Sequence, residues 1–426
     1  MTTSVLQVNS SDMGGGAEVV ALSLHRAYRA RRLDAWLAVG RARSGEDGVL
    51  AIGDDRSRRF RALRDPGVLL DLARGREDFR FPASHRVLGL PPQPPEVLHL
   101  HNLHGGFFDL AALPELSRRQ PTVVTMHDEW LYTGHCANSL DSERWLTGCG
   151  SCPHLDSYPA LRVDGTAGNW KRKAAIYKRL RLHVACPSAH LLNRAQQSML
   201  APAIVSASVI PNGVDLAQFS PADREQARAQ GGLPHGISII VFAAPGVRTN
   251  PYKDFETLEA ALGMLADKPG PAVLALAVGE AGAERQMGRV TLRSLAFTTH
   301  EQVAAYLRAA DLYVHPTRAD NHPLAVLEAL ACGVPVVASR VGGIPEQVRE
   351  ETGVLVEPGK PEALSRAIAE LLGDEPRRRA MGAAAAADAQ GRFDGQRQVN
   401  TYLELYASVK DAGGLVGDRA RASPRR

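Results

Sequence analysis

The sequence predicts an α/β protein made of two doubly wound domains, each a parallel sheet covered by helices. Short β-rich apolar runs recur along the chain, and each is followed by a helical pattern, as is typical of parallel sheets. The same alternation restarts after a turn-rich stretch at residues 209–215, and 426 residues are too many for one core. Because such sheets place their sites beyond the carboxyl ends of the strands, we expect the two domains to face each other across a cleft.

The predicted strands are the apolar runs, taken in chain order. In the first half they are Val5–Val8, Ala35–Val39, Val97–Leu100, Thr122–Met126 and Leu182–Ala185. In the second half they are Ile237–Ala244, Val273–Val278, Val290–Leu295, Leu312–His315, Val334–Ala338 and Val354–Val356. The stretches between them have the spacing of amphipathic helices.

These elements give a prediction for the domain boundaries. Residues 1–212 form the N-terminal domain, and residues 213–392 form the C-terminal domain. Residues 393–410 have helical periodicity and are expected to pack back toward the N-terminal domain. The Arg- and Gly-rich remainder, residues 411–426, is expected to be disordered.

Composition excludes several classes of protein. A formal net charge of +4 is too small to indicate a nucleic-acid partner, and no apolar run approaches the length of a membrane span. The N-terminus lacks the pattern of a signal peptide, and five scattered cysteines suit a reducing compartment rather than a disulfide framework. We therefore expect a cytoplasmic protein.

The segment that carries most chemistry runs from Asp320 to Glu328 (Asp-Asn-His-Pro-Leu-Ala-Val-Leu-Glu). Pro323 suits the first turn of a helix, so the amides of Leu324 and Ala325 are expected at a helix N-terminus, where a diphosphate can bind. Glu328 lies one turn further along the same face and can reach vicinal hydroxyls beside that diphosphate. The segment therefore predicts a nucleotide-sugar site. An ordinary amphipathic helix with surface acids is the alternative.

Three further segments follow predicted strands. Gly14–Gly16 precedes a helical pattern and lets the backbone approach a ligand, although a simple tight turn would use the same residues. Arg248 and Lys253 are two cations on the loop after residues 237–244, and they suit a leaving diphosphate, with exposed surface charges as the alternative. His127 follows the predicted strand Thr122–Met126, so its imidazole is expected at the carboxyl edge of the sheet.

Two patterns permit a functional and an ordinary interpretation. Cys136, Cys149 and Cys152, with His135 and His154 nearby, could hold a structural zinc ion, but one Cys-x-x-Cys pair equally fits a loop with reduced thiols, which we prefer. The basic stretch at residues 171–182 interleaves charges with Ile176, Tyr177 and Leu180. Such a helix could lie on an anionic membrane, or it could be a solvated surface.

Taken together, these motifs resemble glycosyltransferase family 4, the retaining enzymes of GT-B fold with two Rossmann-like domains. The resemblance covers almost the whole chain except its tail. It is carried by Gly14-Gly15-Gly16-Ala17-Glu18, Thr125–Trp130 with Thr133-Gly134, Trp145–Pro153, Ile210–Asp215, Arg248 with Lys253, and Asp320–Glu328. The segment Trp145–Pro153, followed by Tyr158-Pro159 and Asp164, is similar to the branch that builds bacterial exopolysaccharides and other surface glycans.

The resemblance implies a role for each candidate residue. Arg248 and Lys253 would bind the donor diphosphate, and Glu328 would bind the ribose. Asp320 would bind hydroxyls of the donor sugar, and His127 a hydroxyl near the reacting carbon. Gly15 and Gly16 would line the site on the acceptor side, so residues 1–212 would be the acceptor domain and residues 213–392 the donor domain.

Three positions depart from the family pattern. Asp320 stands where glutamate is usual, and Pro323 stands where glycine is common, which leaves the identity of the donor open. Ser142 stands where the surface-glycan branch often has another cysteine, which weakens the zinc hypothesis.

The expected activity is transfer of a hexosyl or N-acetylhexosaminyl group from a nucleotide-diphosphate sugar, UDP rather than GDP, to a carbohydrate or lipid-linked acceptor. The resemblance implies retention of configuration, no metal or other cofactor in the chemistry, and possible contact with the inner face of the membrane. A GT-B epimerase or phosphorylase, or a catalytically silent sugar-binding scaffold, would share the architecture. An epimerase needs acid and base groups against the sugar ring, and a pyridoxal phosphorylase needs a Schiff-base lysine. Neither set of residues stands out in this sequence.

Overall fold

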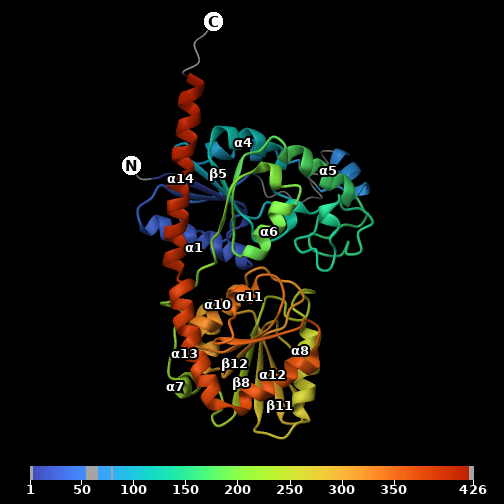
Figure 1. Ribbon diagram of the computed structural model, residues 1–426, viewed down its shortest axis with the longest axis vertical. Coiled ribbons are helices and arrows are strands. Elements are labelled where there is room, and N and C mark those ends of the chain that lie inside the picture. The colour runs from blue at the N-terminus through green and yellow to red at the C-terminus, as the bar shows by residue number, and fades with distance from the viewer. Residues whose placement is uncertain (1–2, 54–65, 78–79, 422–426) are drawn as a thin grey trace. The chain divides into compact units, whose positions relative to one another are not determined.

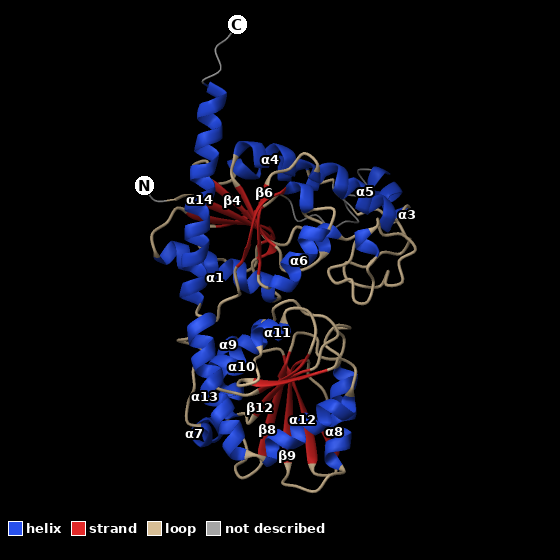
Figure 2. Cartoon of the chain, viewed as in Figure 1, coloured by secondary structure: helices blue, strands red, loops and turns tan. Residues whose placement is uncertain are grey.

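The computed structural model describes residues 3–53, 66–77 and 80–421, and the chain divides into two compact units. The first unit contains residues 1–210 and 399–426, and the second contains residues 211–398. Each unit is one sheet with helices on both faces, as Figures 1 and 2 show for each unit separately. Two doubly wound domains are thus present, as the sequence predicts.

The sheet of the first unit has strand order β3-β2-β1-β4-β5-β6-β7, and every pairing in it is parallel. Its elements are β1 (Val5–Ser11), α1 (Gly16–Ala30), β2 (Ala35–Arg41), β3 (Val49–Ala51), α3 (Pro66–Ala73), β4 (Val97–Leu100), α4 (Leu113–Arg119), β5 (Thr122–Thr125), α5 (Thr166–Tyr177), β6 (Leu182–Cys186), α6 (Ala189–Gln197) and β7 (Ile204–Val209). Short 3-10 turns connect several of these elements.

The sheet of the second unit has strand order β10-β11-β9-β8-β12-β13-β14, and only the pairing of β10 with β11 is antiparallel among those described. Its elements are α7 (Arg224–Gln230), β8 (Ser238–Ala243), α8 (Phe255–Ala266), β9 (Val273–Gly279), β10 (Arg285–Met287), β11 (Val290–Ala296), α9 (His300–Ala309), β12 (Leu312–His315), α10 (Leu324–Ala331), β13 (Val336–Ser339), α11 (Ile344–Gln347), β14 (Gly353–Val356), α12 (Pro361–Gly373) and α13 (Glu375–Arg392).

The second unit has a core on each face of its sheet because successive strand residues point to opposite sides. Ile239 and Val241 of β8 belong to the core that α9, α10 and α13 cover, while Ile240 and Phe242 belong to the core that α8 and α12 cover. Burial on both faces explains why these strands read as continuous apolar runs.

The division between the units falls at residues 210 and 211, two residues before the expected boundary. Asn212 explains the difference, because its side-chain amide donates to the carbonyl of His322 at 3.0 Å and so attaches this residue to the second unit. The backbone of Val214 exchanges hydrogen bonds with Phe393 and Gly395, which likewise extends the second unit beyond the expected residue 392.

The C-terminal helix α14 (Gly395–Arg421) belongs to the first unit from Val399 onward. The hydroxyl of Tyr402 lies 2.7 Å from the Thr125 hydroxyl, and that of Tyr406 lies 2.6 Å from His99 Nδ1 and 3.0 Å from the Tyr28 hydroxyl. The sequence predicts disorder from residue 411, whereas the described backbone continues as a helix as far as Arg421. Residues 422–426 lie outside the described residues.

Candidate active site

The second unit brings together Lys253, Asp320 and His315 at the carboxyl ends of the adjacent strands β8 and β12. The Lys253 ammonium forms an ion pair with Asp320 Oδ2, and His315 Nε2 lies 3.3 Å from the same oxygen. Burial alone would raise the pKa of Asp320, but Lys253 and His315 outweigh it and hold that pKa well below its usual range. Asp320 is therefore an anion across the physiological pH range.

Backbone contacts hold the Lys253 loop against the segment that carries Asp320. The carbonyl of Tyr252 accepts hydrogen bonds from the Thr317 hydroxyl at 2.6 Å and from the Arg318 amide at 2.8 Å. Gly342 lies on the other side with φ +54°, and a Cβ there would come within 1.9 Å of the Asp320 carbonyl oxygen. Only glycine fits this position, so the backbone at Gly342 packs directly against that of Asp320.

Arg248 occupies the same loop between β8 and α8, but its contacts differ from those of Lys253. Its guanidinium donates to the Ser294 hydroxyl at 2.7 Å and lies over the Phe255 ring at 5.2 Å from the centroid. Its backbone amide donates to the Glu280 carboxylate. The structure therefore joins Lys253 directly to Asp320 and directs Arg248 toward β11.

Helix α10 begins at Leu324, one residue later than the sequence predicts. Pro323 is the N-cap, with φ −62° and ψ 129°, and its carbonyl accepts from the Gln347 side chain at 3.1 Å. The placement of Pro323 inside the first turn is thus wrong, because its ψ is extended. Leu324 and Ala325 are the first two helical residues, whose amides have no acceptor within the helix. They form the positive end at which an anion is favoured.

Glu328 lies one turn into α10 and is only 9% exposed. Its burial raises the pKa of the carboxyl to about 7. A carboxyl with this pKa exchanges its proton near neutral pH, so a ligand that donates hydrogen bonds to it would favour the ionised form.

The first unit gathers polar groups at the carboxyl ends of β1, β4 and β5, which are neighbours in the sheet. After β1, Gly14 has φ +151° and Gly15 is the N-cap of α1, with no side-chain cap. Ser10 donates to Glu18 of the first turn at 2.7 Å. Gly15 and Gly16 thus lie at a helix start, as the sequence predicts.

His127 follows β5 at the same edge and is partly buried. Its Nε2 lies 3.0 Å from His101 Nδ1, and burial lowers the pKa of His127 to about 4. Beside it, His104 Nε2 lies 2.7 Å from Asp128 Oδ2. Burial opposes a charge on His104, but Asp128 outweighs it, so the pKa of His104 is raised and that of Asp128 is lowered.

Sequence reasoning missed His315, His101 and the His104–Asp128 pair. A weak signal existed, because His315 ends one apolar run and His101 directly follows another. The carboxyl ends of parallel strands meet at one edge, so strand-end histidines are candidates for the same site.

Comparison with known proteins identifies the family. The family model described as Glycosyltransferase Family 4 matches residues 14–218, and the model described as Glycosyl transferases group 1 matches residues 223–388. D-inositol 3-phosphate glycosyltransferase 1 of Catenulispora acidiphila is 34% identical over 341 residues, which cover 75% of this chain and 73% of that protein. The chain belongs to glycosyltransferase family 4.

Other family 4 relatives align over different shares of their length. The putative colanic acid biosynthesis glycosyl transferase WcaC of Escherichia coli is 26% identical over 95% of this chain and 100% of its own length. The D-inositol 3-phosphate glycosyltransferase of Segniliparus rotundus is 37% identical over 50% of this chain. That alignment covers 49% of the relative, so the chain matches about half the length of several curated relatives.

Solved structures confirm the GT-B fold of this family 4 glycosyltransferase. Sucrose-phosphate synthase of Thermosynechococcus elongatus has a TM-score of 0.66 at 19% identity, covering 96% of this chain and 100% of that one. Anabaena HepE in complex with UDP-glucose has a TM-score of 0.63 at 19% identity, covering 95% and 99%.

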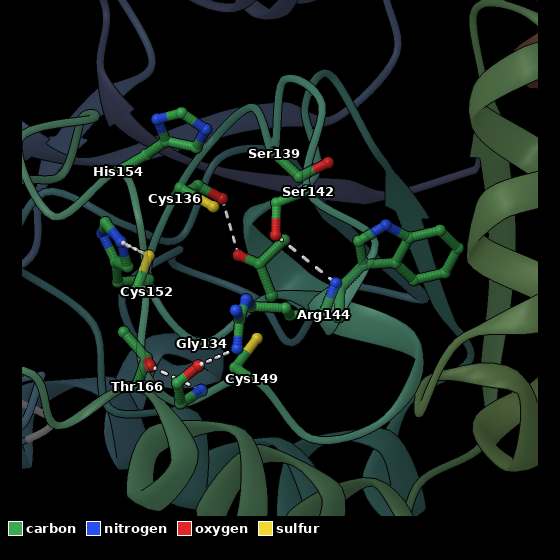
Figure 3. A pocket seen from close by; sticks show the side chains of 13 residues that line it. Gly134, Cys136, Ser139, Ser142, Arg144, Cys149, Cys152, His154 and Thr166 are labelled. Carbon is green, nitrogen blue, oxygen red and sulfur yellow. Dashed lines mark hydrogen bonds between the residues drawn. The ribbon is translucent and has the colours of Figure 1, made fainter.

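Three of the five cysteines of this family 4 chain line one pocket in the first unit. Figure 3 shows Cys136, Cys149 and Cys152 around it, and His135 Nε2 lies 3.5 Å from Cys152 Sγ. His154 is instead bonded to Asp141 at 2.6 Å. Burial raises the pKa of the Cys136 thiol to about 12. Within residues 3–53, 66–77 and 80–421, no three His, Cys, Asp or Glu side chains are arranged to hold a metal ion.

The basic stretch at residues 171–182 exposes Lys171, Lys178, Arg179 and Arg181, but it does not present the interleaved apolar residues on which the membrane hypothesis rests. Lys173 of α5 is fully buried, pairs with Glu77 at 2.9 Å and donates to the Trp130 carbonyl at 2.8 Å. Tyr177 and Leu180 are buried in the core, and Ile176 packs against it. The apolar residues of this stretch therefore face the protein interior.

Proposed function

We propose that this family 4 glycosyltransferase transfers a sugar from a nucleotide-diphosphate donor to a carbohydrate or lipid-linked acceptor, with retention of configuration. The observation that carries this proposal is the partly buried Lys253–Asp320–His315 cluster, which shares a unit with the N-terminus of α10 and with Glu328. Cation, carboxylate and helix start together suit a diphosphate and the polyols attached to it.

Each donor contact follows from this arrangement. The amides of Leu324 and Ala325 would bind diphosphate oxygens, with Arg248 and Lys253 as the accompanying cations. Glu328 would accept hydrogen bonds from the ribose hydroxyls, and Asp320, already held by Lys253, would accept them from the sugar. In this proposal the Lys253 ammonium is shared between the Asp320 carboxylate and the diphosphate.

The proposed chemistry uses neither a metal ion nor a covalent enzyme intermediate. The leaving diphosphate takes the proton of the acceptor hydroxyl on the face from which it departs, and the acceptor oxygen bonds to the anomeric carbon on that same face. The protein contributes amides and cations that stabilise the developing diphosphate charge and hold the reactants in position. A structural zinc ion at Cys136, Cys149 and Cys152 is the minor alternative.

Donor and acceptor classes are proposed from relatives. UDP is favoured over GDP because a protein of the same fold, HepE, was solved with UDP-glucose. A role in bacterial polysaccharide or surface-glycan synthesis is favoured by similarity to WcaC along that relative's whole length. Gly15 and Gly16 would lie on the acceptor side, and the transferred group would be a hexose or an N-acetylhexosamine.

A lipid-linked acceptor implies contact with an anionic membrane, and the exposed leucines of α3 favour that contact better than the stretch at residues 171–182. Leu69, Leu70 and Leu72 are 55%, 48% and 37% exposed. The preceding residues 54–65 lie outside the described residues, but their sequence holds five arginines against three aspartates: Arg56, Arg58, Arg59, Arg61 and Arg64, with Asp54, Asp55 and Asp65. Apolar and basic residues together suit a lipid surface. No helix in the described part of the chain is long and apolar enough to cross a membrane.

The experiment incubates the purified protein with EDTA and a panel of UDP- and GDP-sugars, and follows the release of nucleoside diphosphate. We expect slow hydrolysis of one UDP-sugar and faster release when an acceptor glycan is added, with the product anomer matching the donor by NMR. Lys253→Ala should lower the rate of release by about two to three orders of magnitude, while the exposed Lys268→Ala should leave it unchanged. Donor binding without release would favour a silent scaffold, and epimerised donor would favour an epimerase.

A further inference from the structure

Three buried or partly buried side chains form a continuous hydrogen-bonded line across adjacent strands of the first unit. Gln7 lies on β1, His101 follows β4, and His127 follows β5. The Gln7 side chain lies 3.0 Å from His101 Nε2, and His101 Nδ1 lies 3.0 Å from His127 Nε2. Gln7 and His101 are 0% and 1% exposed.

The backbone of α1 decides which end of the Gln7 amide faces His101. The side chain lies between the carbonyl of Ala21 and the amide N–H of His25. When its nitrogen lies on the Ala21 side, it donates to that carbonyl at 3.3 Å and its oxygen accepts from the His25 amide at 3.2 Å. The opposite orientation sets oxygen against oxygen and N–H against N–H. In the favourable orientation the Gln7 nitrogen also donates to His101 Nε2 at 3.0 Å.

This orientation fixes the protons of both histidines. Because His101 Nε2 accepts from Gln7, a neutral His101 carries its proton on Nδ1. That proton is donated to His127 Nε2, so a neutral His127 in turn carries its proton on Nδ1. Burial lowers the pKa of His101 well below its usual range and that of His127 to about 4, so both rings are neutral near pH 7.

We propose that Gln7 and His101 are positioning residues that hold His127 in the Nδ1–H tautomer, so that His127 is a hydrogen-bond donor and not a general base. Its Nε2 lone pair accepts from His101, and its Nδ1 already carries a proton, so neither nitrogen can take the proton of an acceptor hydroxyl. The mechanistic consequence, that this proton goes to the leaving diphosphate, rests on the proposed function. The tautomer itself does not.

The neighbouring side chains are compatible with this direction. The ring of His99 packs at a tilt against that of His101, with 4.2 Å between centroids, but it bonds elsewhere, to the Thr125 hydroxyl at 2.7 Å and the Tyr406 hydroxyl at 2.6 Å. Both of these partners are hydroxyls, which can donate or accept. Neither hydroxyl therefore opposes the direction that the Gln7 amide gives to the Gln7–His101–His127 line.

The test is nitrogen-15 NMR of the full chain with labelled histidine, which reports the protonated nitrogen of each neutral ring. His101→Asn and His127→Asn assign the two signals. We expect a protonated Nδ1 and an unprotonated Nε2 for both residues. A His127 protonated on Nε2 in the wild type would overturn the proposal.

Two variants of Gln7 test its control over the tautomer. In Gln7→Glu a carboxylate, which only accepts, should draw the His101 proton to Nε2 and shift the His127 proton from Nδ1 to Nε2. Gln7→Met, of similar size and uncharged, should give a mixture of tautomers even if the glutamate variant folds poorly. Gln93→Glu changes an exposed glutamine and should leave both signals unchanged.

Tautomers that are the same in the wild type and Gln7→Met would contradict control by Gln7. These readouts are independent of activity. If the expected tautomers are found but no nucleotide sugar is turned over, the proposed function fails and the assignment of the protons stands.

Discussion

The ammonium of Lys253 is bound to the carboxylate of Asp320, 67 positions later in the chain, and both side chains are less than one-fifth exposed. The pair connects the loop after β8 with the loop after β12, which are adjacent strands. A fixed anion beside a cation can bind a sugar hydroxyl and a phosphate oxygen at the same time. The first prediction concerns this pair.

Lys253→Ala is expected to lower turnover by about two to three orders of magnitude, the scale for removing one preorganised charge that stabilises a transition state. Steady-state rates of donor hydrolysis and transfer measure it, and Lys268→Ala is the exposed control. Arg248→Ala should act in the same direction. Normal turnover in both variants, with unchanged thermal unfolding, would remove these cations from the diphosphate site.

Donor binding is expected to weaken as pH falls through about 7, the raised pKa of buried Glu328. Ribose hydroxyls donate hydrogen bonds to the ionised carboxylate of Glu328, so a protonated Glu328 must lose its proton before the donor binds. The dissociation constant should therefore rise about tenfold between pH 8 and pH 6. Calorimetric titration with the donor measures this change.

Glu328→Gln should bind the donor weakly and with little dependence on pH, while maximal turnover changes less than the donor KM. The effect of pH on folding stability is opposite to its effect on donor binding. A carboxyl with a raised folded pKa contributes stability at low pH that is lost as pH rises through about 7. A pH-dependent donor affinity that persists in the glutamine variant would assign the proton to another group.

The sequence predicted most of the fold because strands buried on both faces leave a strong apolar signal. All of the predicted strands are present, whereas three others were missed. β3 and β10 have only three residues each, and β7 (Ile204–Val209) alternates small polar residues at the sheet edge, with mostly exposed or partly exposed side chains. Edge strands of this kind have little apolar periodicity to recognise.

The site was harder to predict because its contacts join distant segments. Local spacing identified Lys253, Asp320 and Glu328, but not His315, which reads as the last residue of a strand. The same limit explains the error over Lys173. Helical periodicity does not show that a lysine in a basic cluster forms a buried ion pair with an acid, Glu77, that lies much earlier in the chain.

Lys173→Met should destabilise the first unit by about 3–5 kcal/mol, because it leaves the carboxylate of Glu77 buried without its cation. Lys171→Met changes an exposed lysine two positions earlier in the same helix and should alter stability by no more than about 0.5 kcal/mol. Urea unfolding monitored by tryptophan fluorescence compares the two. Equal stability would mean that Glu77 is neutral or solvated when unpaired.

Chelation is expected to leave transfer intact, because the proposed chemistry stabilises the diphosphate with amides and cations alone. Activity in EDTA, with and without added magnesium or manganese, measures this. Metal analysis of protein purified without chelator separately tests for zinc at Cys136, Cys149 and Cys152. Activity lost in EDTA and restored by magnesium at unchanged fold would refute the metal-independent mechanism.

Vesicle binding is expected to depend on α3. Full-length protein should co-sediment with anionic vesicles more than with neutral ones, and less at high salt, because basic residues contribute about 1 kcal/mol each near such a surface and are screened by ions. Replacing Leu69, Leu70 and Leu72 by serine should reduce this binding without lowering turnover of a soluble acceptor. Phe297→Ser, at a residue 66% exposed in the second unit, is the matched control. Equal, negligible binding to both kinds of vesicle would mean that the exposed leucines of α3 do not bind lipid, and it would favour a soluble acceptor.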